Sequence, residues 1–500
     1  MTGGVLAAAA GGSEPLAGPI VVALLVMIIV ACAVAITIVW RWMPRRIVEL
    51  VPQLADASAL LQARVWATFV LVATIIGAVP ILLARRESTL GYALRALRPT
   101  EIGDSWAPMF EALDSLVHRP GVPVYDAVWE TGYKFQYPLM SVLPVDPLIR
   151  FFGMDREAFH ASLNVASWIA FAVLGALTAV LWARLHGPRD AAFWQVVPPR
   201  SLIVLAPAGI LGAMVFFPIT RGLHLGQIQT TLTVLVGISL LAWCTGNKVV
   251  AGIALALCCI VKPQWVIIAL WALLRREWRF VIAGVVTAGA AFALSIVVYG
   301  VEQVLSYADL LLRLGSSGET FYANQSVNGL LNRLLFNGES LHFSHSELAP
   351  DHPVVAAGTA ISVVVILLFA LLWRVRSSPT TLDLSTAVLS LTIAAPIAWE
   401  HHYGVAYAVF AVLMVAQFRE GSPGRPVIVF TGIAYVLISQ NLFPIVNATH
   451  DSGWNILQSY MFFGGIILLA LLYVQSARAQ SVELPARRIS VPAPIGDPAA

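Results

Sequence analysis

The chain has 500 residues, of which 59% are hydrophobic and only 11% are charged. A soluble globular domain carries about 25% charged residues, so this composition excludes a soluble protein. The net charge of +3 is small, and no nucleic-acid partner is expected. Apolar runs of roughly 15 to 22 residues recur along the chain without the alternation of barrel strands, as expected of helices that cross a bilayer. The sequence therefore predicts an all-α polytopic membrane protein embedded in a lipid bilayer.

The N-terminal part is predicted to hold two spans. Residues 1–19 are small and polar, and we expect them to be disordered. Within residues 20–84, an apolar span at 20–40 is followed by an amphipathic segment at 44–63. We expect this segment to lie along the cytoplasmic membrane surface, before a second span at 65–83.

Two long polar stretches interrupt the apolar spans. Residues 85–160 are predicted to be an outer loop that forms one wall of a catalytic site, and residues 300–352 a second outer loop. A transmembrane core is expected over residues 161–474, and a disordered cytoplasmic tail over 475–500. About thirteen spans are predicted, which makes a bundle of about 11 to 13 transmembrane helices. Those after the first two are 161–182, 202–218, 228–243, 249–261, 264–274, 280–299, 354–373, 384–398, 403–417, 427–442 and 458–474.

The basic residues predict the orientation of these spans. When residues 41–64 are placed in the cytoplasm and the spans alternate, most of the 30 basic residues fall on the cytoplasmic side, as the positive-inside rule requires. This predicts a multi-pass protein of the plasma membrane with a cytoplasmic C-terminus. The polar clusters beside the apolar spans then share the outer face: Asp104, Arg221, His224, Gln227, Lys262, Gln264, Asn324, Gln325, Asn328, Glu400, His401 and His402.

The sequence lacks the motifs of disulfide-rich, metal-binding and nucleotide-binding proteins. The four cysteines, Cys32, Cys244, Cys258 and Cys259, lie in or at the ends of apolar runs, where we expect packing residues with no disulfide and no metal site. The sequence has no P-loop, no glycine-rich dinucleotide motif that opens a helix and no HExxH motif. No cofactor is expected.

Asp104 is the first candidate catalytic residue. A carboxylate at the outer membrane edge can take a proton from an attacking hydroxyl. The alternative is a structural role, because Asp104-Ser-Trp could begin a helix. Asp114 and Asp126 are rival carboxylates in the same stretch. Farther along, Tyr137 lies at the predicted return to the membrane, where it could belong to the interfacial aromatic belt or line a lipid groove.

Two basic clusters lie at predicted outer ends of spans. The stretch from Arg221 through His224 to Gln227 is predicted to be a tight turn. This turn would be suited to binding a sugar or a phosphate. The alternative is a polar turn whose groups bond one another and bind no ligand. Lys262-Pro-Gln264 interrupts an apolar run, and a lysine at membrane depth is costly unless it is paired. An anionic phosphate would explain Lys262, and we favour this over the alternative that the side chain only reaches the interface.

Amide side chains precede an amphipathic stretch in the second polar loop. They are Asn324, Gln325 and Asn328. Amides both donate and accept hydrogen bonds, so they suit ligands rich in hydroxyl groups.

The sharpest cluster is Trp399-Glu400-His401-His402, which ends a predicted span. These side chains need water or a ligand at the bilayer edge. A metal site is one alternative, since histidine and carboxylate are metal ligands. Adjacent histidines on a helix point about 100° apart, so one ion could not easily bind both, and no metal is expected.

Taken in order, these motifs resemble those of the GT-C membrane glycosyltransferases of glycosyltransferase family 87, which include mycobacterial mannosyl- and arabinofuranosyltransferases. The resemblance runs from about residue 85 to residue 414. The motifs that carry it are Asp104, Tyr125-Asp126, Phe135-Gln-Tyr-Pro138, Gly226-Gln227, Lys262-Pro-Gln264, Asn324-Gln-Ser326, Asn328-Gly-Leu-Leu-Asn-Arg333 and Pro396-Ile-Ala-Trp-Glu-His-His402.

The resemblance implies a GT-C-like bundle and an inverting transfer of a mannosyl or arabinofuranosyl unit on the outer face. The donor would be a polyprenyl-phosphate sugar and the acceptor a glycolipid or glycan hydroxyl. Asp104 would be the general base, and His401 and His402 would lie near the donor. Lys262 and Arg221 would neutralise the leaving phosphate. The other donor-binding candidates are His224, Gln227, Gln264, Asn324, Gln325 and Asn328, with Tyr137, Trp399 and Glu400 in support.

Two other functions remain open from the sequence. A non-catalytic lipid or polysaccharide transporter or flippase would need a polar path through the bilayer, whereas the polar groups here gather on one face. An O-antigen ligase-like enzyme with a diphosphate-linked donor would need more outer basic residues than Arg221 and Lys262.

Overall fold

The computed structural model describes residues 45–82, 88–98, 102–188, 191–315, 318–344, 349–419 and 422–483, and isolated positions between 30 and 41. Within these residues the regular structure is helical, apart from two isolated β-bridges. Most of residues 1–40, including most of the first predicted span, and the end of the predicted tail lie outside the described residues. The prediction of an all-α polytopic membrane protein is confirmed.

Among the described residues, six helical units are long and apolar enough to cross a membrane by themselves. They contain α3 (Ala57–Leu82), α8 (Arg156–Leu185), α15 (Trp278–Tyr299), α19 (Pro353–Leu372), α21 (Ala406–Phe418) and α24 (Tyr460–Glu483). Two bent pairs of helices raise the number to eight when each pair is counted as one span. They are α10 (Leu202–Met214) with α11 (Phe217–Leu225), and α22 (Arg425–Ser439) with α23 (Phe443–Val446).

Four further apolar helices are shorter. At 1.5 Å per residue, even the 16-residue α12 is only about 24 Å long, less than the hydrocarbon thickness of about 30 Å. Every predicted span from residue 65 onward coincides with one of these long, bent or short units. The short helices are α12 (Gln229–Cys244), α13 (Lys248–Val261), α14 (Val266–Leu274) and α20 (Thr381–Ala394).

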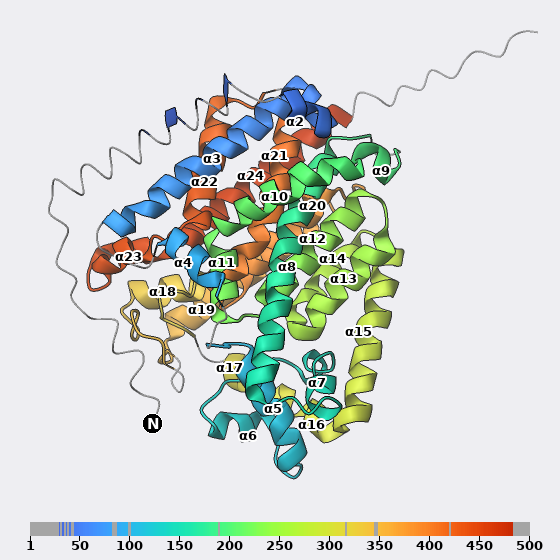
Figure 1. The fold of residues 1–500 in the computed structure, drawn as a ribbon. Coiled ribbons are helices and arrows are strands. Elements are labelled where there is room, and N and C mark those ends of the chain that lie inside the picture. Colours follow the sequence, from blue (N-terminus) through green and yellow to red (C-terminus); the bar gives the residue numbers. More distant parts are fainter. Residues whose placement is uncertain are drawn as a thin grey trace, which may run out of the picture.

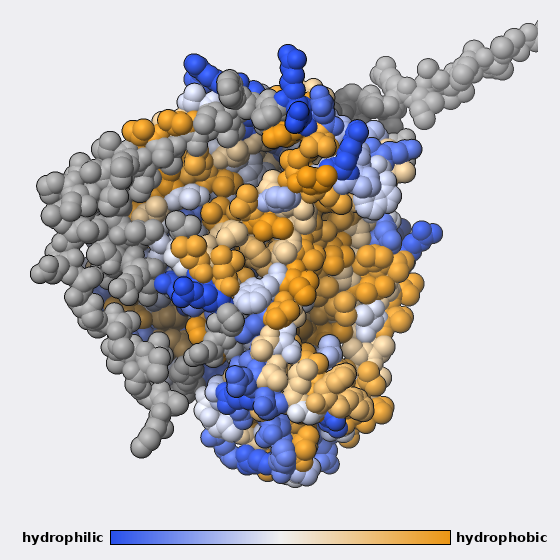
Figure 2. Space-filling view, viewed as in Figure 1, coloured by the Kyte–Doolittle hydropathy of each residue, from blue (hydrophilic) through white to orange (hydrophobic). Residues whose placement is uncertain are grey.

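The bundle has a buried centre and a lipid-facing rim. The span that contains α21 is 89% buried, whereas that of α15 is only 11% buried, so α21 lies at the centre and α15 at the edge (Figure 1). Figure 2 shows a broad hydrophobic belt over the helices, with hydrophilic residues toward both ends of the molecule. This is the surface expected of a protein that sits in a bilayer.

The two long polar stretches contain several short helices, and they pack on each other. Val124 donates its backbone N–H to the side chain of Gln303 at 2.8 Å, and Gln303 donates to the carbonyl of Val122 at 3.0 Å. A small apolar core of their own includes Phe135 and Val304. The result is a lobe at one end of the bundle (Figure 1). Its helices are α5 (Trp106–His118), α6 (Val124–Glu130), α7 (Asp146–Arg150), α16 (Val301–Leu305) and α17 (Tyr307–Gly315).

The predicted boundaries differ in two places. The amphipathic segment predicted at 44–63 contains two short helices, but α3 already begins at Ala57, so the last part belongs to a membrane helix. The tail predicted from residue 475 begins as helix, because α24 continues to Glu483. The remaining helices are α2 (Arg45–Leu50), α4 (Thr89–Ala96), α9 (Phe193–Val196), α18 (Val327–Leu334), η2 (Pro52–Ala55), η3 (Leu139–Ser141), η4 (Pro199–Ser201), η5 (Pro263–Trp265), η6 (Glu400–Val405), η7 (Asn447–Thr449) and η8 (Gly453–Ser459).

Candidate active site

Asp104 lies where the lobe meets the end of α11. Its backbone N–H bonds the carbonyl of Leu225 at 2.9 Å, and that of Ser105 bonds the carbonyl of Gly226 at 3.1 Å. Gly226 has φ = 68°, and a Cβ there would lie 3.0 Å from Cα of Gly103. Only glycine allows this backbone conformation and this close approach without strain. The side chain of Asp104 is exposed.

A chain of hydrogen bonds orients Gln227 toward Asp104. Ser105 donates its hydroxyl proton to Oε1 of Gln227 at 2.9 Å. Its oxygen accepts the N–H of Ile228 at 3.1 Å and lies 3.0 Å from the hydroxyl of Tyr137. Because Ser105 has only one proton to donate, Tyr137 must be the donor in this contact. The amide nitrogen of Gln227 therefore faces Asp104 and donates to its Oδ2.

Tyr137 is suited to this donor role. It lies in the lobe, and burial raises the pKa of its phenol above the usual value, with the Asp104 carboxylate adding to the rise. The phenol therefore keeps its proton at neutral pH. The sequence placed Tyr137 in a supporting role, and the structure connects it to Asp104 through Ser105 and Gln227.

Arg221 lies on α11 and not in a turn. The sequence predicted a tight turn from Arg221 to Gln227, but residues 217–225 are helical and end at the left-handed Gly226. The bend of 76° lies before this helix, where Pro218 lacks the N–H that would bond the carbonyl of Met214. Nε of Arg221 lies 3.0 Å from Oε1 of Glu400, which is buried.

Lys262 lies in an extended link between α13 and η5. Its φ and ψ are −131° and 97°, as expected for a residue before proline, here Pro263. Its ammonium donates to Oε1 of Gln229 at 2.8 Å and lies 2.6 Å from Nε2 of His402. Since an ammonium has no lone pair, Nε2 of His402 is the acceptor, and the neutral ring carries its proton on Nδ1.

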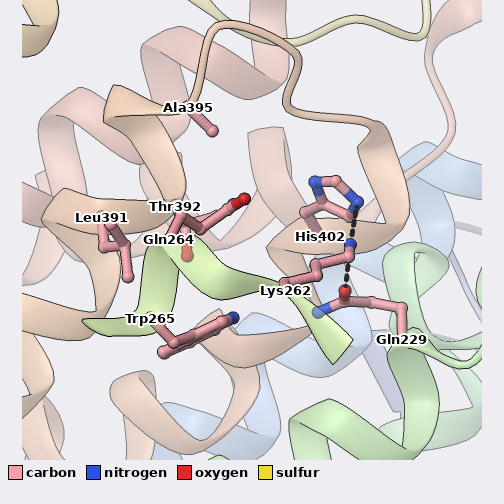
Figure 3. A pocket seen from close by; sticks show the side chains of 8 residues that line it. All are labelled: Gln229, Lys262, Gln264, Trp265, Leu391, Thr392, Ala395 and His402. Carbon is pink, nitrogen blue, oxygen red and sulfur yellow. Dashed lines mark hydrogen bonds between the residues drawn. The ribbon is translucent and has the colours of Figure 1, made fainter. Parts of the chain in front are cut away.

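These side chains face a small pocket. Figure 3 shows Lys262 between Gln229 and His402, with the second ring nitrogen of His402 turned away from Lys262. Gln264 contributes to the same lining, and its side chain is exposed. The residues around the pocket are Gln229, Lys262, Gln264, Trp265, Leu391, Thr392, Ala395 and His402.

The two cations differ in how their charge is balanced. Arg221 is paired with the carboxylate of Glu400, whereas both hydrogen-bond partners of Lys262 are neutral. Asp104 acts electrostatically on Lys262 and on Glu400, so all of these groups share one end of the bundle. Lys262 is the cation better placed to balance a negative charge that a ligand brings.

Within the part of the chain that the structure describes, several buried polar atoms beside this cluster have no hydrogen-bond partner. They are Oε2 of Glu400, both ring nitrogens of His401 and Oγ1 of Thr230. His401 is 4% exposed, and its ring lies 4.8 Å from that of His402. Buried polar atoms are usually satisfied, so these four atoms are available to hydrogen-bond a polar ligand or water.

Three predicted sugar-binding amides have structural partners instead. Asn324 accepts the N–H of Ala398 at 3.0 Å, and Gln325 donates to the carbonyl of Gln458 at 2.7 Å. Asn328 accepts the N–H of Glu319 at 3.0 Å. All three amides are buried. Asn324 thereby holds the second polar stretch against the residues before η6 and Gln325 holds it against η8, whereas Asn328 bonds within the stretch. None of the three amides lines the pocket beside Lys262.

The remaining predicted residues lie around this site. His224 packs its ring 5.3 Å from that of Tyr92, and Trp399 packs against Phe343 at 5.7 Å. The rival carboxylate Asp114 pairs with His118 at 3.0 Å and lies about 12 Å along α5 from the first residue of this helix, Trp106.

The other rival, Asp126, lies in the first turn of α6. Among the described residues, no group of three or more histidine, cysteine, aspartate or glutamate side chains could hold a metal ion.

Sequence reasoning missed Ser105, Gln229 and Thr230. Ser105 directly follows Asp104, and its sequence context predicts only the start of a helix. Gln229 and Thr230 begin α12. The sequence feature that could have indicated them is a pair of polar residues at the start of an apolar run. Gln229 bonds Lys262, 33 positions away, and Ser105 bonds Gln227, 122 positions away, which no local pattern shows.

Fold and site together define a polytopic membrane protein with a carboxylate, a lysine and two histidines at one end of its bundle. The chain matches no curated protein. It matches the family model of glycosyltransferase family 87 over residues 135–399. The protein therefore belongs to glycosyltransferase family 87, as the motifs predicted, and is a membrane glycosyltransferase.

Proposed function

We propose that this glycosyltransferase moves a mannosyl or arabinofuranosyl unit from a polyprenyl-phosphate donor to a hydroxyl of a glycolipid or glycan. The reaction takes place at the outer face of the plasma membrane. A lipid-linked donor suits a site at the end of an apolar bundle, because its polyprenyl chain stays in the bilayer while its phosphate reaches Lys262. Membership of a glycosyltransferase family favours this enzyme over the non-catalytic transporter that the sequence left open.

Asp104 acts as the general base. The acceptor oxygen attacks the anomeric carbon, and its proton passes to the carboxylate of Asp104. The bond between the anomeric carbon and the phosphate oxygen breaks, so polyprenyl phosphate leaves with the electron pair. Attack opposite the leaving group inverts the anomeric configuration. The Gln227 amide donates to Asp104 and holds the carboxylate in place.

Lys262 balances the charge that develops on the leaving phosphate. A cation fixed at this point stabilises the transition state more than the ground state, because the phosphate gains charge as the bond breaks. The observation that carries the proposal is that the ammonium of Lys262 is held by two neutral acceptors, Gln229 and His402. His402 keeps a donor on Nδ1 that can reach the phosphate or the sugar.

The test is transfer of labelled sugar from polyprenyl-phosphate mannose, and separately arabinose, to membrane glycolipids by the purified protein. Asp104→Asn should lower turnover by about 10² to 10⁴ while donor binding is kept. Asp114→Asn is the matched control in the same lobe and should keep turnover. Full activity of Asp104→Asn would refute its role as the base, and no transfer from either donor would refute the proposed donor class.

A further inference from the structure

Two adjacent phenylalanines lie on the surface of the lobe, directly after α7. Phe151 is 83% exposed and Phe152 is 72% exposed. Single exposed hydrophobic residues are common on protein surfaces. Two neighbouring aromatic side chains that expose most of their surface are less common, and exposed hydrophobic patches mark contacts with other molecules or with membranes. The candidate active site uses neither residue.

Hydrogen bonds to α7 hold the turn that carries the two phenylalanines. The N–H groups of Phe151 and Phe152 both donate to the carbonyl of Pro147, at 3.0 and 3.3 Å. Gly153 donates to the carbonyl of Ile149 at 3.0 Å. Its φ of 61° is a conformation that glycine adopts without strain. The backbone of the turn is therefore fixed, and it keeps both phenylalanines at the surface of the lobe.

The turn lies beside the end of a lipid-facing helix. Arg150, which precedes Phe151, places its guanidinium carbon 5.6 Å from the ring centre of Tyr299, the last residue of α15. Only 11% of the α15 span is buried, and Val297, two positions before Tyr299, is exposed. Tyrosine and arginine are typical of the level at which a membrane meets water. The turn is therefore at the level where α15 leaves the bilayer.

The hydrophobic surface of the bundle continues onto this side of the lobe. Val301 and Leu305 are on α16, the helix that follows α15, and both are exposed. Figure 2 shows hydrophobic residues that extend from the belt to the part of the lobe where Figure 1 places α7 and α16. Because this surface is continuous with the one that the bilayer covers, lipid is the partner that fits the two phenylalanines.

The turn is also connected to the catalytic end of the lobe. Leu148 and Ile149 on α7 pack against the small apolar core of the lobe, which contains Trp106. Trp106 is the first residue of α5 and lies two positions after Asp104. A contact between the turn and the membrane therefore restrains α5, and with it Asp104, relative to the membrane surface.

We propose that Phe151 and Phe152 insert into the membrane interface on the lobe side of the bundle and anchor the lobe to the lipid. Insertion removes both rings from water, which is favourable for apolar surface. The anchor keeps Asp104 at a constant distance from the hydrocarbon. A second copy of the chain is the other partner that could cover the rings. The proposal does not depend on the donor or on the reaction proposed above.

Photocrosslinking in phospholipid nanodiscs tests the insertion. The photoreactive p-benzoylphenylalanine is placed at Phe151 or Phe152, where its shape is close to that of the natural residue. The same residue at Val297, on the lipid-facing α15, is the positive control. At Val117, an exposed residue near the end of α5, it is the matched control within the lobe. We expect lipid adducts at Phe151 and Phe152 in yields near that at Val297 and several-fold above that at Val117, measured by mass spectrometry.

Hydrogen exchange in the same nanodiscs tests the anchoring. Phe151→Ser combined with Phe152→Ser should speed amide exchange in α5 and α7 several-fold, whereas Val117→Ser should leave it unchanged. Thermal unfolding shows whether each variant is folded.

Two results would overturn the insertion. One is a lipid yield at Phe151 and Phe152 no higher than at Val117, and the other is crosslinking of these positions to a second copy of the chain in place of lipid. Unchanged exchange in the folded double variant would overturn the anchoring.

Discussion

The ammonium of Lys262 lies 2.6 Å from Nε2 of His402, although the two residues are 140 positions apart in the chain. Lys262 is in the link that Pro263 imposes between two helices, and His402 is in the short helix η6. The pair joins two of the predicted motifs into one site. It also determines the tautomer of His402 and leaves a donor on its second ring nitrogen.

Replacing Lys262 tests its role in charge balance. Lys262→Met keeps the aliphatic stem and removes the charge, and we expect kcat to fall by about 10² to 10³ because the leaving phosphate loses its cation. Lys262→Arg should recover part of the rate. Lys134→Met is the control, because the ammonium of Lys134 donates to the backbone carbonyl of Ser344 at 3.3 Å. The turnover of this variant should stay near that of the wild type. A fully active Lys262→Met would contradict the assignment.

The hydrogen bond from Gln227 to Asp104 predicts a pH effect. In Gln227→Glu, a second carboxylate would repel that of Asp104 and favour its protonated form. The acid limb of the profile of kcat/KM against pH should therefore move to higher pH. Gln227→Leu removes the hydrogen bond without adding charge, so its shift should be smaller. An unchanged limb in both variants would mean that another group titrates as the base.

The ion pair of Arg221 and Glu400 predicts a stability effect. Arg221→Gln leaves a carboxylate that is 3% exposed without its cation, which should lower the free energy of unfolding by about 3 kcal/mol. The double variant Arg221→Gln/Glu400→Gln should recover most of this loss, because neither charge remains. Thermal unfolding in detergent measures both. A double variant as unstable as the single one would show that the pair is not what stabilises this region.

Gly226 tests how strictly the backbone positions Asp104. Alanine at Gly226 would carry φ = 68° and meet Gly103 at 3.0 Å, so both stability and transfer should fall. Gly132→Ala is the matched control, because Gly132 has φ = 84° with open space around it. It should cost only the backbone strain, about 1 kcal/mol, and keep the transfer rate. Equal transfer rates in the two variants would argue against positioning through Gly226.

Local patterns in the sequence were sufficient to predict the class of protein and the positions of its helices. An apolar run specifies a membrane helix by itself, since its backbone groups bond within the segment. Every predicted span from residue 65 onward therefore has its helix. The breaks at Pro218 and Pro263 also have local causes. The ordered motifs were enough to predict the family that the comparison confirmed.

Only the tertiary structure decided which polar residues meet. Arg221 pairs with Glu400 and Lys262 with His402 across more than 130 positions, and these pairings depend on how helices pack, which no local period encodes. The same reason applies to Asn324, Gln325 and Asn328. Their amide side chains are suited to binding a sugar, but in the structure these side chains are buried and hydrogen-bonded to backbone groups. The sequence determined the helices and the candidate residues, whereas the packing of distant segments determined the site.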